Sequence, residues 1–361
     1  RALLSSGTRR SSSERDNRTL RIPSKLHAVP ATPCSSTEMG TNHAMSFRTE
    51  SWMGDLSESI SGRTLHELRI PGSHDSATNV LGDGVAPGEP CVYAAVPCII
   101  RGWSVCQVAS VSEQLRAGCR YLDLRTASVK GKPDLRIVHG LVGGPVLEVL
   151  EQVSAFLAAN PHEIVILDFQ HFYEVSQAQQ AALLEQCLEL FGAAGCIPPE
   201  KVKTATLGEL WAAKTRVLLL WGDAEFAPTR PDVLCERPSS ILSPWAGDGR
   251  TQNEATRAKF RRILETFMAE DPGDDARLRV LQTVSGPNAT MIVTGLFTCA
   301  NLKSHGRAMN KDVERWLRGA WRPGLEDGTL AVNIVLLDFV NLCGSLVDAI
   351  IRLNLGPDQA G

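Results

Sequence analysis

Three stretches of the chain end a run of apolar residues with side chains that can move a proton or bind an anion. The first breaks at a Pro-Gly pair and places His74 and Asp75 directly after it. The second carries Asp123 and Arg125, and the third ends in His139. Polar groups at the ends of successive strands are typical of α/β barrels, whose active sites lie on loops at the carboxyl ends of the strands.

The two histidines have the chemistry of a general acid and a general base, because the pKa of free imidazole lies close to neutral pH. A single histidine is more often structural, but His74 and His139 both follow predicted strands, which favours a catalytic pair. One imidazole that takes a proton and another that gives one are the minimum for cleaving a phosphodiester with an internal hydroxyl. The consecutive Ser73, His74 and Asp75 diverge from the backbone and cannot form a hydrolase triad.

Asp123 and Arg125 lie two residues apart on one predicted strand, so their side chains share a face. The planar guanidinium can bind phosphate through two hydrogen bonds, and the alternative is a structural ion pair. Asp338 ends the last predicted strand. In a closed barrel that strand lies beside the first, so Asp338 can reach His74 and fix its tautomer, the alternative being a surface cap.

Eight predicted strands alternate with amphipathic helices, as in repeated βα units with right-handed crossovers. The sequence therefore predicts a single domain of the α/β class with an irregular (β/α)8 TIM-type barrel. The predicted strands are residues 67–70, 121–125, 136–138, 163–169, 216–221, 240–245, 278–284 and 332–339, and the predicted helices are residues 146–158, 178–191, 253–268, 289–297 and 311–318.

The composition narrows the classes of partner. A formal charge of −3 gives no electrostatic footprint for nucleic acid. No apolar run approaches the roughly 20 residues of a membrane-spanning helix. We therefore expect no nucleic-acid partner, no transmembrane segment, and only peripheral contact with a membrane.

The chain divides into a barrel and two terminal segments. Residues 1–50 are rich in Ser, Arg and Pro and predict a disordered or non-native segment, with a transit peptide as the alternative. Residues 51–356 form the predicted barrel, and residues 357–361 a tail. A long insert over residues 82–110 predicts a rim over the site, facing the substrate or a membrane, or simply packing on the barrel.

The ten cysteines contain no CxxC pair, so no zinc or redox motif is present. Cys91, Cys98 and Cys106 fall in the insert, and a disulfide between two of them is the alternative for a secreted protein. No secretory signal is recognisable, which favours a reducing compartment. We therefore predict a cytoplasmic protein that contacts membranes peripherally.

Taken in order, these motifs resemble those of the phosphatidylinositol-specific phospholipase C X-domain family, in its metal-independent form found in bacterial enzymes and small X-domain-only proteins. The resemblance covers about residues 52 to 355. Its motifs are LRIPGSHDS at 68–76, the G-x-R-x-x-D-x-R strand at 118–125, Val138-His139-Gly140, NPHEIVIL at 160–167, and Leu337-Asp338-Phe339.

The resemblance implies a role for each histidine and its carboxylate. His74 is the implied general base that removes the inositol 2-hydroxyl proton, with Asp338 holding its ring. His139 is the implied general acid that protonates the departing diacylglycerol oxygen, with Asp75 supporting it. The implied products are diacylglycerol and a cyclic inositol phosphate, which water can open.

The same resemblance implies that Asp123 orients the arginine or the inositol and that Arg125 stabilises the charge developing on phosphate. Calcium-dependent relatives carry a metal-binding carboxylate where Arg125 stands, and a guanidinium cannot ligate a cation. We therefore predict no cofactor and no metal. The predicted substrate is a phosphatidylinositol-type phospholipid at a membrane surface.

Two departures from the family pattern bear on the headgroup. Gln170-His171 and Trp221-Gly222-Asp223 stand where relatives often place charged groups, which favours unphosphorylated phosphatidylinositol or another phosphodiester over a polyphosphorylated headgroup. Trp245 and Asp248 are further candidate headgroup contacts. The alternatives are a barrel that binds phosphoinositides or a protein without turnover, and a metal-dependent phosphodiesterase, against which Arg125 argues.

Overall fold

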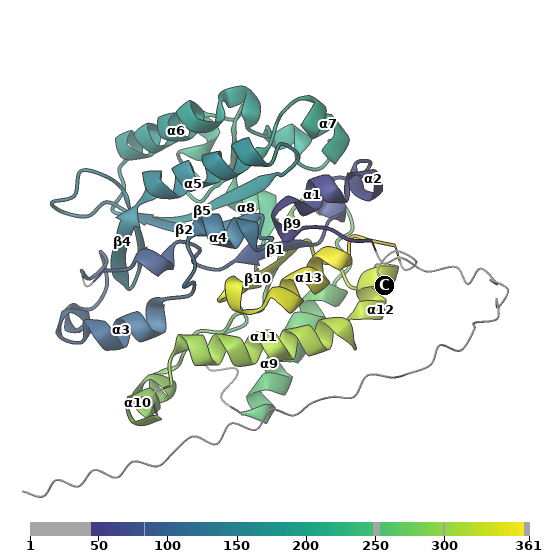
Figure 1. Cartoon of the computed structure of the whole chain (residues 1–361). Coiled ribbons are helices and arrows are strands. Elements are labelled where there is room, and N and C mark those ends of the chain that lie inside the picture. The colour runs from purple at the N-terminus through teal and green to yellow at the C-terminus, as the bar shows by residue number, and fades with distance from the viewer. Residues whose placement is uncertain (1–44, 83, 248–252, 299, 357–361) are drawn as a thin grey trace, which may run out of the picture. The chain divides into compact units, whose positions relative to one another are not determined.

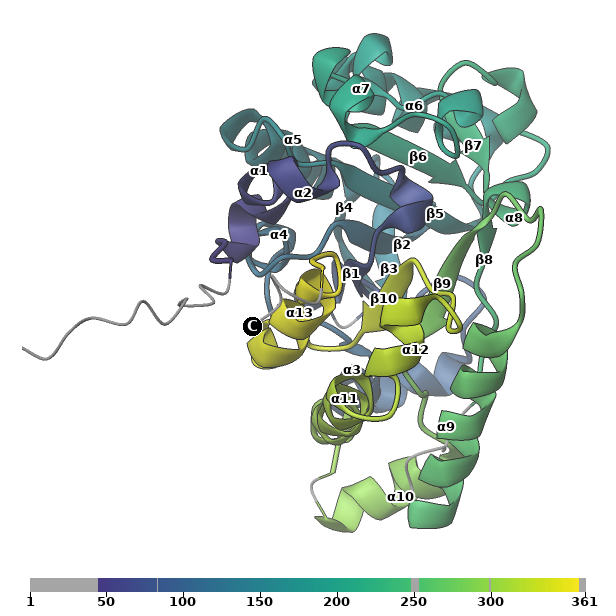
Figure 2. The ribbon, with the colours of Figure 1, turned by 90° about the vertical axis from the view of Figure 1, so that its right-hand side faces the viewer.

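A computed structural model describes residues 45–82, 84–247, 253–298 and 300–356 of the chain. Within these residues eight parallel strands follow one another in the order β7-β6-β5-β2-β1-β10-β9-β8 and curve into a barrel wall (Figures 1 and 2). The strands are β1 (Ile70–Ser73), β2 (Tyr121–Ala127), β5 (Val165–Tyr173), β6 (Val217–Trp221), β7 (Leu234–Glu236), β8 (Ile241–Leu242), β9 (Leu278–Gln282) and β10 (Ile334–Leu337). The predicted irregular TIM-type barrel is confirmed.

Helices surround this wall (Figure 2). The α-helices are α1 (Trp52–Asp55), α2 (Ser57–Ile60), α3 (Pro97–Ser104), α4 (Val111–Arg116), α5 (Val146–Ala159), α6 (Gln177–Phe191), α7 (Leu207–Ala212), α8 (Arg237–Ser240), α9 (Glu254–Ala269), α10 (Ala289–Thr298), α11 (Leu302–Arg318), α12 (Arg322–Asp327) and α13 (Gly344–Arg352). Short 3-10 helices are η1 (Thr49–Ser51), η2 (Leu65–Glu67), η3 (Thr78–Val80), η4 (Cys91–Ala95), η5 (Ala193–Gly195), η6 (Pro199–Lys201), η7 (Ala227–Thr229) and η8 (Val340–Leu342). No described helix is both long enough and apolar enough to cross a membrane.

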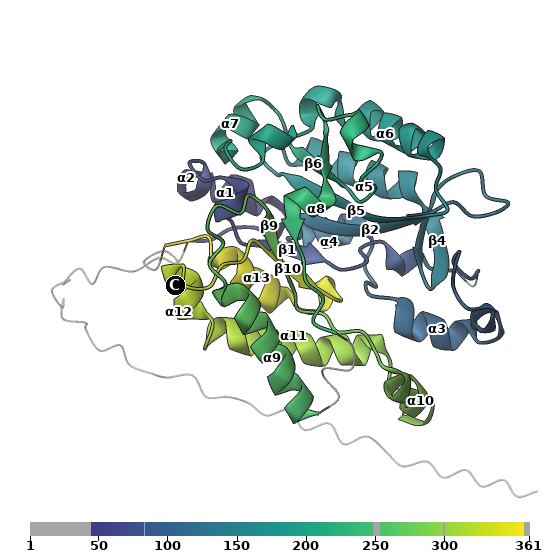
Figure 3. The ribbon, with the colours of Figure 1, turned by 180° about the vertical axis from the view of Figure 1, so that it is seen from behind.

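Side chains alternate between two apolar layers along the strands. On neighbouring strands Tyr121 and Ile166 belong to one core cluster, whereas Leu122 and Leu167 belong to a second cluster that packs on α5 and α6. Figures 1 and 3 show α3, β4 (Leu141–Pro145) and α10 at one end of the strands and α1, α2 and α12 at the other. The first end carries the polar residues described below.

The first strand lies later in the chain than predicted. Pro71 and Gly72 belong to β1 itself and do not form the predicted break. A Cβ at Gly72 would lie 3.0 Å from both Ile334 Cγ2 and Tyr121 Cδ1, so this glycine allows the flanking strands to approach closely. The chain turns instead at Asp75, whose φ is 42°.

The third predicted strand is not part of the parallel wall. β3 (Arg136–His139) pairs antiparallel with β2 and forms a hairpin with β4. Gly143, Gly144 and Pro145 looked like helix-start signals but lie in β4. The short β7, which the sequence did not predict, completes the eight parallel strands instead.

The predicted helices correspond to α5, α6, α9, α10 and α11. α11 begins at Leu302 and not at residue 311, because Asn301 caps it by accepting a hydrogen bond from the Ser304 N–H. Cys91, Cys98 and Cys106 are free thiols, so the alternative of a disulfide among them is not supported.

Only part of the amino-terminal segment, and none of the carboxyl-terminal tail, lies within the described residues. Residues 1–44 and 357–361 lie outside the described residues. Residues 45–50 are described, and Met45 and Phe47 pack against the core, so packing begins before residue 51.

Arg120 anchors the amino-terminal residues to the barrel. Its side chain is fully buried, its Nε donates to Glu163 Oε2 at 2.6 Å, and its Nη2 donates to the carbonyl oxygens of Thr49 and Glu50. This network joins η1 to β2 and to the turn before β5.

We expect Arg120→Met to lower the free energy of unfolding by about 3–5 kcal/mol, because it leaves the buried carboxylate of Glu163 without its cation. Urea denaturation measures this change. Arg322→Met is the matched control, since the Arg322–Glu326 pair is exposed, and it should stay within about 0.5 kcal/mol. Similar losses in both variants would contradict the assigned role of Arg120.

Candidate active site

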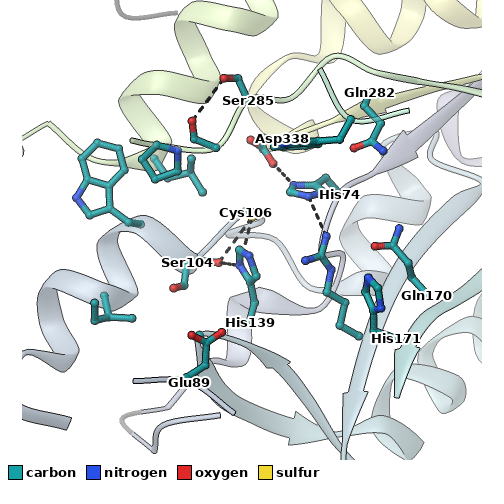
Figure 4. A pocket seen from close by; sticks show the side chains of 18 of the residues that line it. His74, Glu89, Ser104, Cys106, His139, Gln170, His171, Gln282, Ser285 and Asp338 are labelled. Atoms are coloured by element: carbon teal, nitrogen blue, oxygen red, sulfur yellow. Dashed lines mark hydrogen bonds and ion pairs between the residues drawn. The ribbon is translucent and has the colours of Figure 1, made fainter. Parts of the chain in front are cut away.

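The predicted site residues converge at the carboxyl ends of β1, β2 and β10, and Figure 4 shows His74, His139 and Asp338 of this group. His74 and Asp75 follow β1, Asp123 and Arg125 lie on β2, and Asp338 follows β10. His139, the last residue of β3, reaches the same place from the hairpin. Four of these side chains, those of His74, Arg125, His139 and Asp338, line one cavity. Asp75 and Asp123 are buried and lie within ion-pair distance of His74 and Arg125.

His74 and Asp338 meet because their strands are neighbours in register. Ser73 pairs with Leu337, so the next residue of each strand enters the same end of the barrel. The Nδ1–H of His74 donates to Asp338 Oδ1 at 2.9 Å. This bond fixes the tautomer and directs Nε2 of His74 toward the cavity (Figure 4).

Asp75 contacts three of the site's cationic or protonatable side chains. Its Oδ1 lies 2.7 Å from Arg125 Nε, and its Oδ2 lies 3.2 Å from His139 Nε2 and 3.4 Å from His74 Nε2. Burial alone would raise the pKa of Asp75, but Arg125 and the two histidines hold it well below its usual range. Asp75 is therefore a permanent anion between three cationic or protonatable groups.

His139 is oriented by the last residue of α3. Its Nδ1–H donates to the carbonyl oxygen of Ser104 at 2.7 Å, so its Nε2 faces Asp75. The ring centroids of His74 and His139 are 6.3 Å apart. Two imidazoles, each with one nitrogen fixed by the protein, thus present their second nitrogen to the same region.

Arg125 lies between the carboxylates and the cavity. Its Nη2 is 3.7 Å from Asp123 Oδ2 and 3.4 Å from His74 Nε2, and 21% of its side chain is exposed. Burial lowers the pKa of Arg125, but Asp75 and Asp123 outweigh it and raise the pKa further. The guanidinium is a fixed cation beside His74.

His74, Arg125, His139 and Asp338 line a cavity of about 600 Å³, whose wall also includes part of the predicted rim. The insert contributes Glu89, Tyr93, Ile100, Trp103 and Ser104 to its wall. A cavity of this size holds a small polar headgroup rather than a macromolecule.

The comparisons with known proteins agree on one family. The family model described as "Phosphatidylinositol-specific phospholipase C, X domain" matches residues 100–221. PI-PLC X domain-containing protein 2 of Mus musculus is 32% identical over 90% of this chain and 93% of its own length. The chain belongs to the phosphatidylinositol-specific phospholipase C X-domain family.

Two further relatives are more distant. Variant-surface-glycoprotein phospholipase C of Trypanosoma cruzi is 27% identical over 82% of this chain and 86% of its own length. The phosphatidylinositol-specific phospholipase C of Listeria monocytogenes has a TM-score of 0.56 and 18% identity, covering 85% of this chain and 99% of its own. The second likeness shows that the X-domain chain shares the fold of that enzyme.

Several residues that shape this X-domain site carry no signal in the sequence. The Gln107 side chain donates to the carbonyl oxygens of His74 and Leu337 and accepts from Val340 N–H, which ties the ends of β1 and β10 together. Cys106 Sγ–H donates to Asp75 Oδ2 at 3.4 Å. Both residues come from the insert, which the sequence identified only as a rim.

Arg237, at the start of α8, also lines the cavity. Its Nε donates to the Asp168 carboxylate at 2.9 Å, and Tyr121 donates its hydroxyl to the same carboxylate. Burial raises the pKa of Asp168 to about 6 despite Arg237. This X-domain chain therefore places a second guanidinium in the pocket, from a strand end that sequence reasoning did not identify.

Only some of the residues predicted to contact the headgroup line the cavity. Gln170 and His171 line the cavity, and so does Trp245, whose ring centroid lies 6.3 Å from that of His74. Trp221 is fully buried against Phe169. Asp248 lies outside the described residues.

Burial lowers the pKa of His74, but Asp75 and Asp338 outweigh it and raise this pKa to about 9. We expect the His74 ring to titrate near this value in a two-dimensional NMR titration of the chelator-treated protein. Asp338→Asn should lower the pKa, because the carboxylate that stabilises the imidazolium is gone. An unchanged His74 titration in that variant would contradict this account.

Among the described residues, one group of three side chains has the spacing of metal ligands: His74, Asp75 and Cys106. The predicted roles need no metal there. The Cys106 thiol nevertheless adds a sulfur ligand to this group, which a pair of histidines cannot provide.

Proposed function

We propose that the chain is a phosphoric diester hydrolase that cleaves a phosphatidylinositol-type phospholipid into diacylglycerol and a cyclic inositol phosphate. The supporting observation is that two oriented imidazoles and one guanidinium line a single cavity, with Nε2 of His74 and Nε2 of His139 both within 3.4 Å of Asp75 Oδ2. Family membership supports the same class of reaction.

In the proposed reaction Nε2 of His74 removes the proton of the inositol 2-hydroxyl, whose oxygen attacks phosphorus. The bond between phosphorus and the diacylglycerol oxygen breaks, and His139 Nε2 gives its proton to that oxygen. Arg125 stabilises the charge that develops on the phosphoryl oxygens, in the place of a metal ion. Water then opens the cyclic phosphate with the two histidines exchanging roles.

The carboxylates position the groups that react. Asp338 holds the His74 ring, and Asp75 stabilises the protonated form of His139 while it fixes Arg125 Nε. Asp123 holds the far end of the guanidinium. Because the free His74 is protonated below about pH 9, cleavage should become faster as the pH rises toward that value.

An exposed apolar helix supports contact with a lipid surface. Ile292 of α10 lines the cavity, whereas Val293, Leu296 and Phe297 of the same helix face solvent, Phe297 with 84% of its surface exposed. Exposed apolar residues grouped in this way mark interaction sites. We infer that the protein contacts membranes peripherally, from the cytoplasmic side.

The charge of the cavity favours a headgroup without additional phosphates. Among the described residues that line it, Arg125 and Arg237 are the only arginines or lysines, and both are paired with carboxylates. We therefore infer unphosphorylated phosphatidylinositol as the substrate.

Product analysis tests this function. The purified chain is incubated with vesicles of mixed phospholipids and excess chelator, and phosphorus NMR follows the released headgroup. We expect a cyclic inositol phosphate from phosphatidylinositol and no product from phosphatidylcholine. No release from any lipid, together with retained binding to inositol lipids, would instead indicate a binding module.

A further inference from the structure

Cys106 is a buried thiol inside the site, and the proposed reaction does not use it. Its Sγ lies 3.4 Å from Asp75 Oδ2, and the same oxygen lies 3.4 Å from His74 Nε2. One ligand atom from each of His74, Asp75 and Cys106 lies within 4.8 Å of the other two. A nitrogen, an oxygen and a sulfur donor thus surround one point.

Two of the three donor–donor distances match tetrahedral coordination, and the third, between the His74 nitrogen and Cys106 Sγ, is no more than 4.8 Å. Zinc binds nitrogen and oxygen at about 2.0–2.2 Å and sulfur at about 2.3 Å, so tetrahedral ligand atoms lie about 3.3–3.6 Å apart. Both measured distances from Asp75 Oδ2 are 3.4 Å. An ion can therefore be held after small movements of the side chains, with the Cys106 thiol proton and the proton on His74 Nε2 released to solvent.

The surroundings of the three donors also suit a metal ion. A histidine that binds metal commonly donates its other ring N–H to a carboxylate, and His74 Nδ1 donates in this way to Asp338. Arg125 Nε pairs with Oδ1 of Asp75, whereas Oδ2 faces the ion and gives up its 3.2 Å contact with His139 Nε2 when the ion binds. Arg125 Nη2, 3.4 Å from His74 Nε2, must move toward the cavity when the ion binds.

The thiol selects the kind of ion. Calcium and magnesium prefer oxygen ligands, whereas zinc and cobalt accept sulfur together with imidazole. Three protein ligands leave the fourth tetrahedral position open to water or to a substrate oxygen in the cavity.

We propose that His74, Asp75 and Cys106 form a reversible binding site for a thiophilic divalent cation, with Zn²⁺ as the ion of choice, and that the bound ion inhibits the enzyme. Inhibition follows because the ion occupies the Nε2 lone pair with which His74 would accept the substrate proton. The inhibition rests on the proposed function, whereas the binding does not.

Cobalt is the probe for binding, because a thiolate–cobalt bond gives a charge-transfer absorption band in the near ultraviolet. The full chain carries Cys91→Ser and Cys98→Ser, which removes the two thiols exposed among the described residues, together with Cys34→Ser and Cys299→Ser, which lie outside the described residues. We expect one equivalent of Co²⁺ to produce the band, Zn²⁺ to displace it, and Cys106→Ser to abolish it. A buried thiol elsewhere, Cys343, provides the matched control, since Cys343→Ser should keep the band.

NMR gives a readout that needs no change at Cys106. Paramagnetic Co²⁺ should shift or broaden the ring signals of His74 and leave those of the remote, exposed His162 unchanged. Co²⁺ that leaves the His74 signals in place, or a band that persists in Cys106→Ser, would overturn the assigned site.

Inhibition is measured on soluble phosphatidylinositol analogues, with each variant compared with its own metal-free rate. We expect Zn²⁺ to inhibit, a chelator to restore activity, and Ca²⁺ or Mg²⁺ at equal concentration to have no effect. Cys106→Ser should raise the half-inhibitory Zn²⁺ concentration by more than about tenfold. Equal inhibition of both proteins, or activation by Zn²⁺, would refute the inhibitory site.

These experiments distinguish a failure of the proposed metal site from a failure of the proposed phospholipase function. A cobalt band through Cys106 in a protein that cleaves no lipid under any condition supports the metal site and removes the phospholipase function. Cleavage without a cobalt band supports the function and removes the metal site.

Discussion

His74→Ala should lower kcat for cleavage of phosphatidylinositol by about 10²–10⁴-fold, the usual contribution of a positioned general acid or base. The reason is the position of the ring: Nδ1 of His74 is held by the Asp338 carboxylate, and Nε2 lies 3.4 Å from the Arg125 guanidinium, which we propose binds the phosphate. Initial rates on a water-soluble analogue measure the loss without the complication of vesicle binding.

The matched control is His162→Ala, an exposed histidine whose ring packs against Trp211 and does not line the cavity. It should retain the rate of the unchanged protein. Circular dichroism of both variants checks the fold. Activity in His74→Ala close to that of His162→Ala would remove the general base from the mechanism.

The meeting of His74 and Asp338 could be predicted because it depends only on strand order. In a closed parallel barrel the last strand lies beside the first, and the observed pairing of Ser73 with Leu337 places the following residues together. Asp123 and Arg125 were predictable for a similar reason, because the two-residue period of a strand fixes their common face.

The support of His139 could not be predicted in this way. His139 stands on an antiparallel hairpin, and its Nδ1 is held by a backbone carbonyl, that of Ser104, which any residue type would supply. Gln107 reaches β1 and β10 from the insert through its side-chain amide, over sequence separations that no local pattern records. Arg237 follows β7, a strand too short to show a hydrophobic period.

The misplaced first strand has a different physical cause. Proline and glycine usually mark a turn, but Gly72 is required by close packing against the flanking strands β2 and β10. The turn itself occurs at Asp75, in a left-handed backbone conformation that aspartate tolerates better than most residues. The Pro-Gly pair therefore correctly indicated a turn, but the turn lies three residues after Gly72, at Asp75.

Arg125→Ala should lower kcat by about 10²–10³-fold and change KM much less, because the guanidinium stabilises charge that is greatest in the transition state. Arg125→Lys should recover little of this loss. Lysine keeps the positive charge, but it cannot bind two phosphoryl oxygens in a fork while Nε holds Asp75 at 2.7 Å. Steady-state kinetics on the soluble analogue separate kcat from KM.

Arg230→Ala is the control, since Arg230 pairs with Asp232 on the surface and lies outside the cavity. Excess chelator should leave the rate of the unchanged protein undiminished, because the cation that faces the phosphate is a side chain. Full activity in Arg125→Lys would show that charge alone is sufficient. Loss of activity in chelator, restored by Ca²⁺, would show that a metal ion and not Arg125 supplies the positive charge in the transition state. Arg125 and the two histidines would then bind the substrate without catalysing its cleavage.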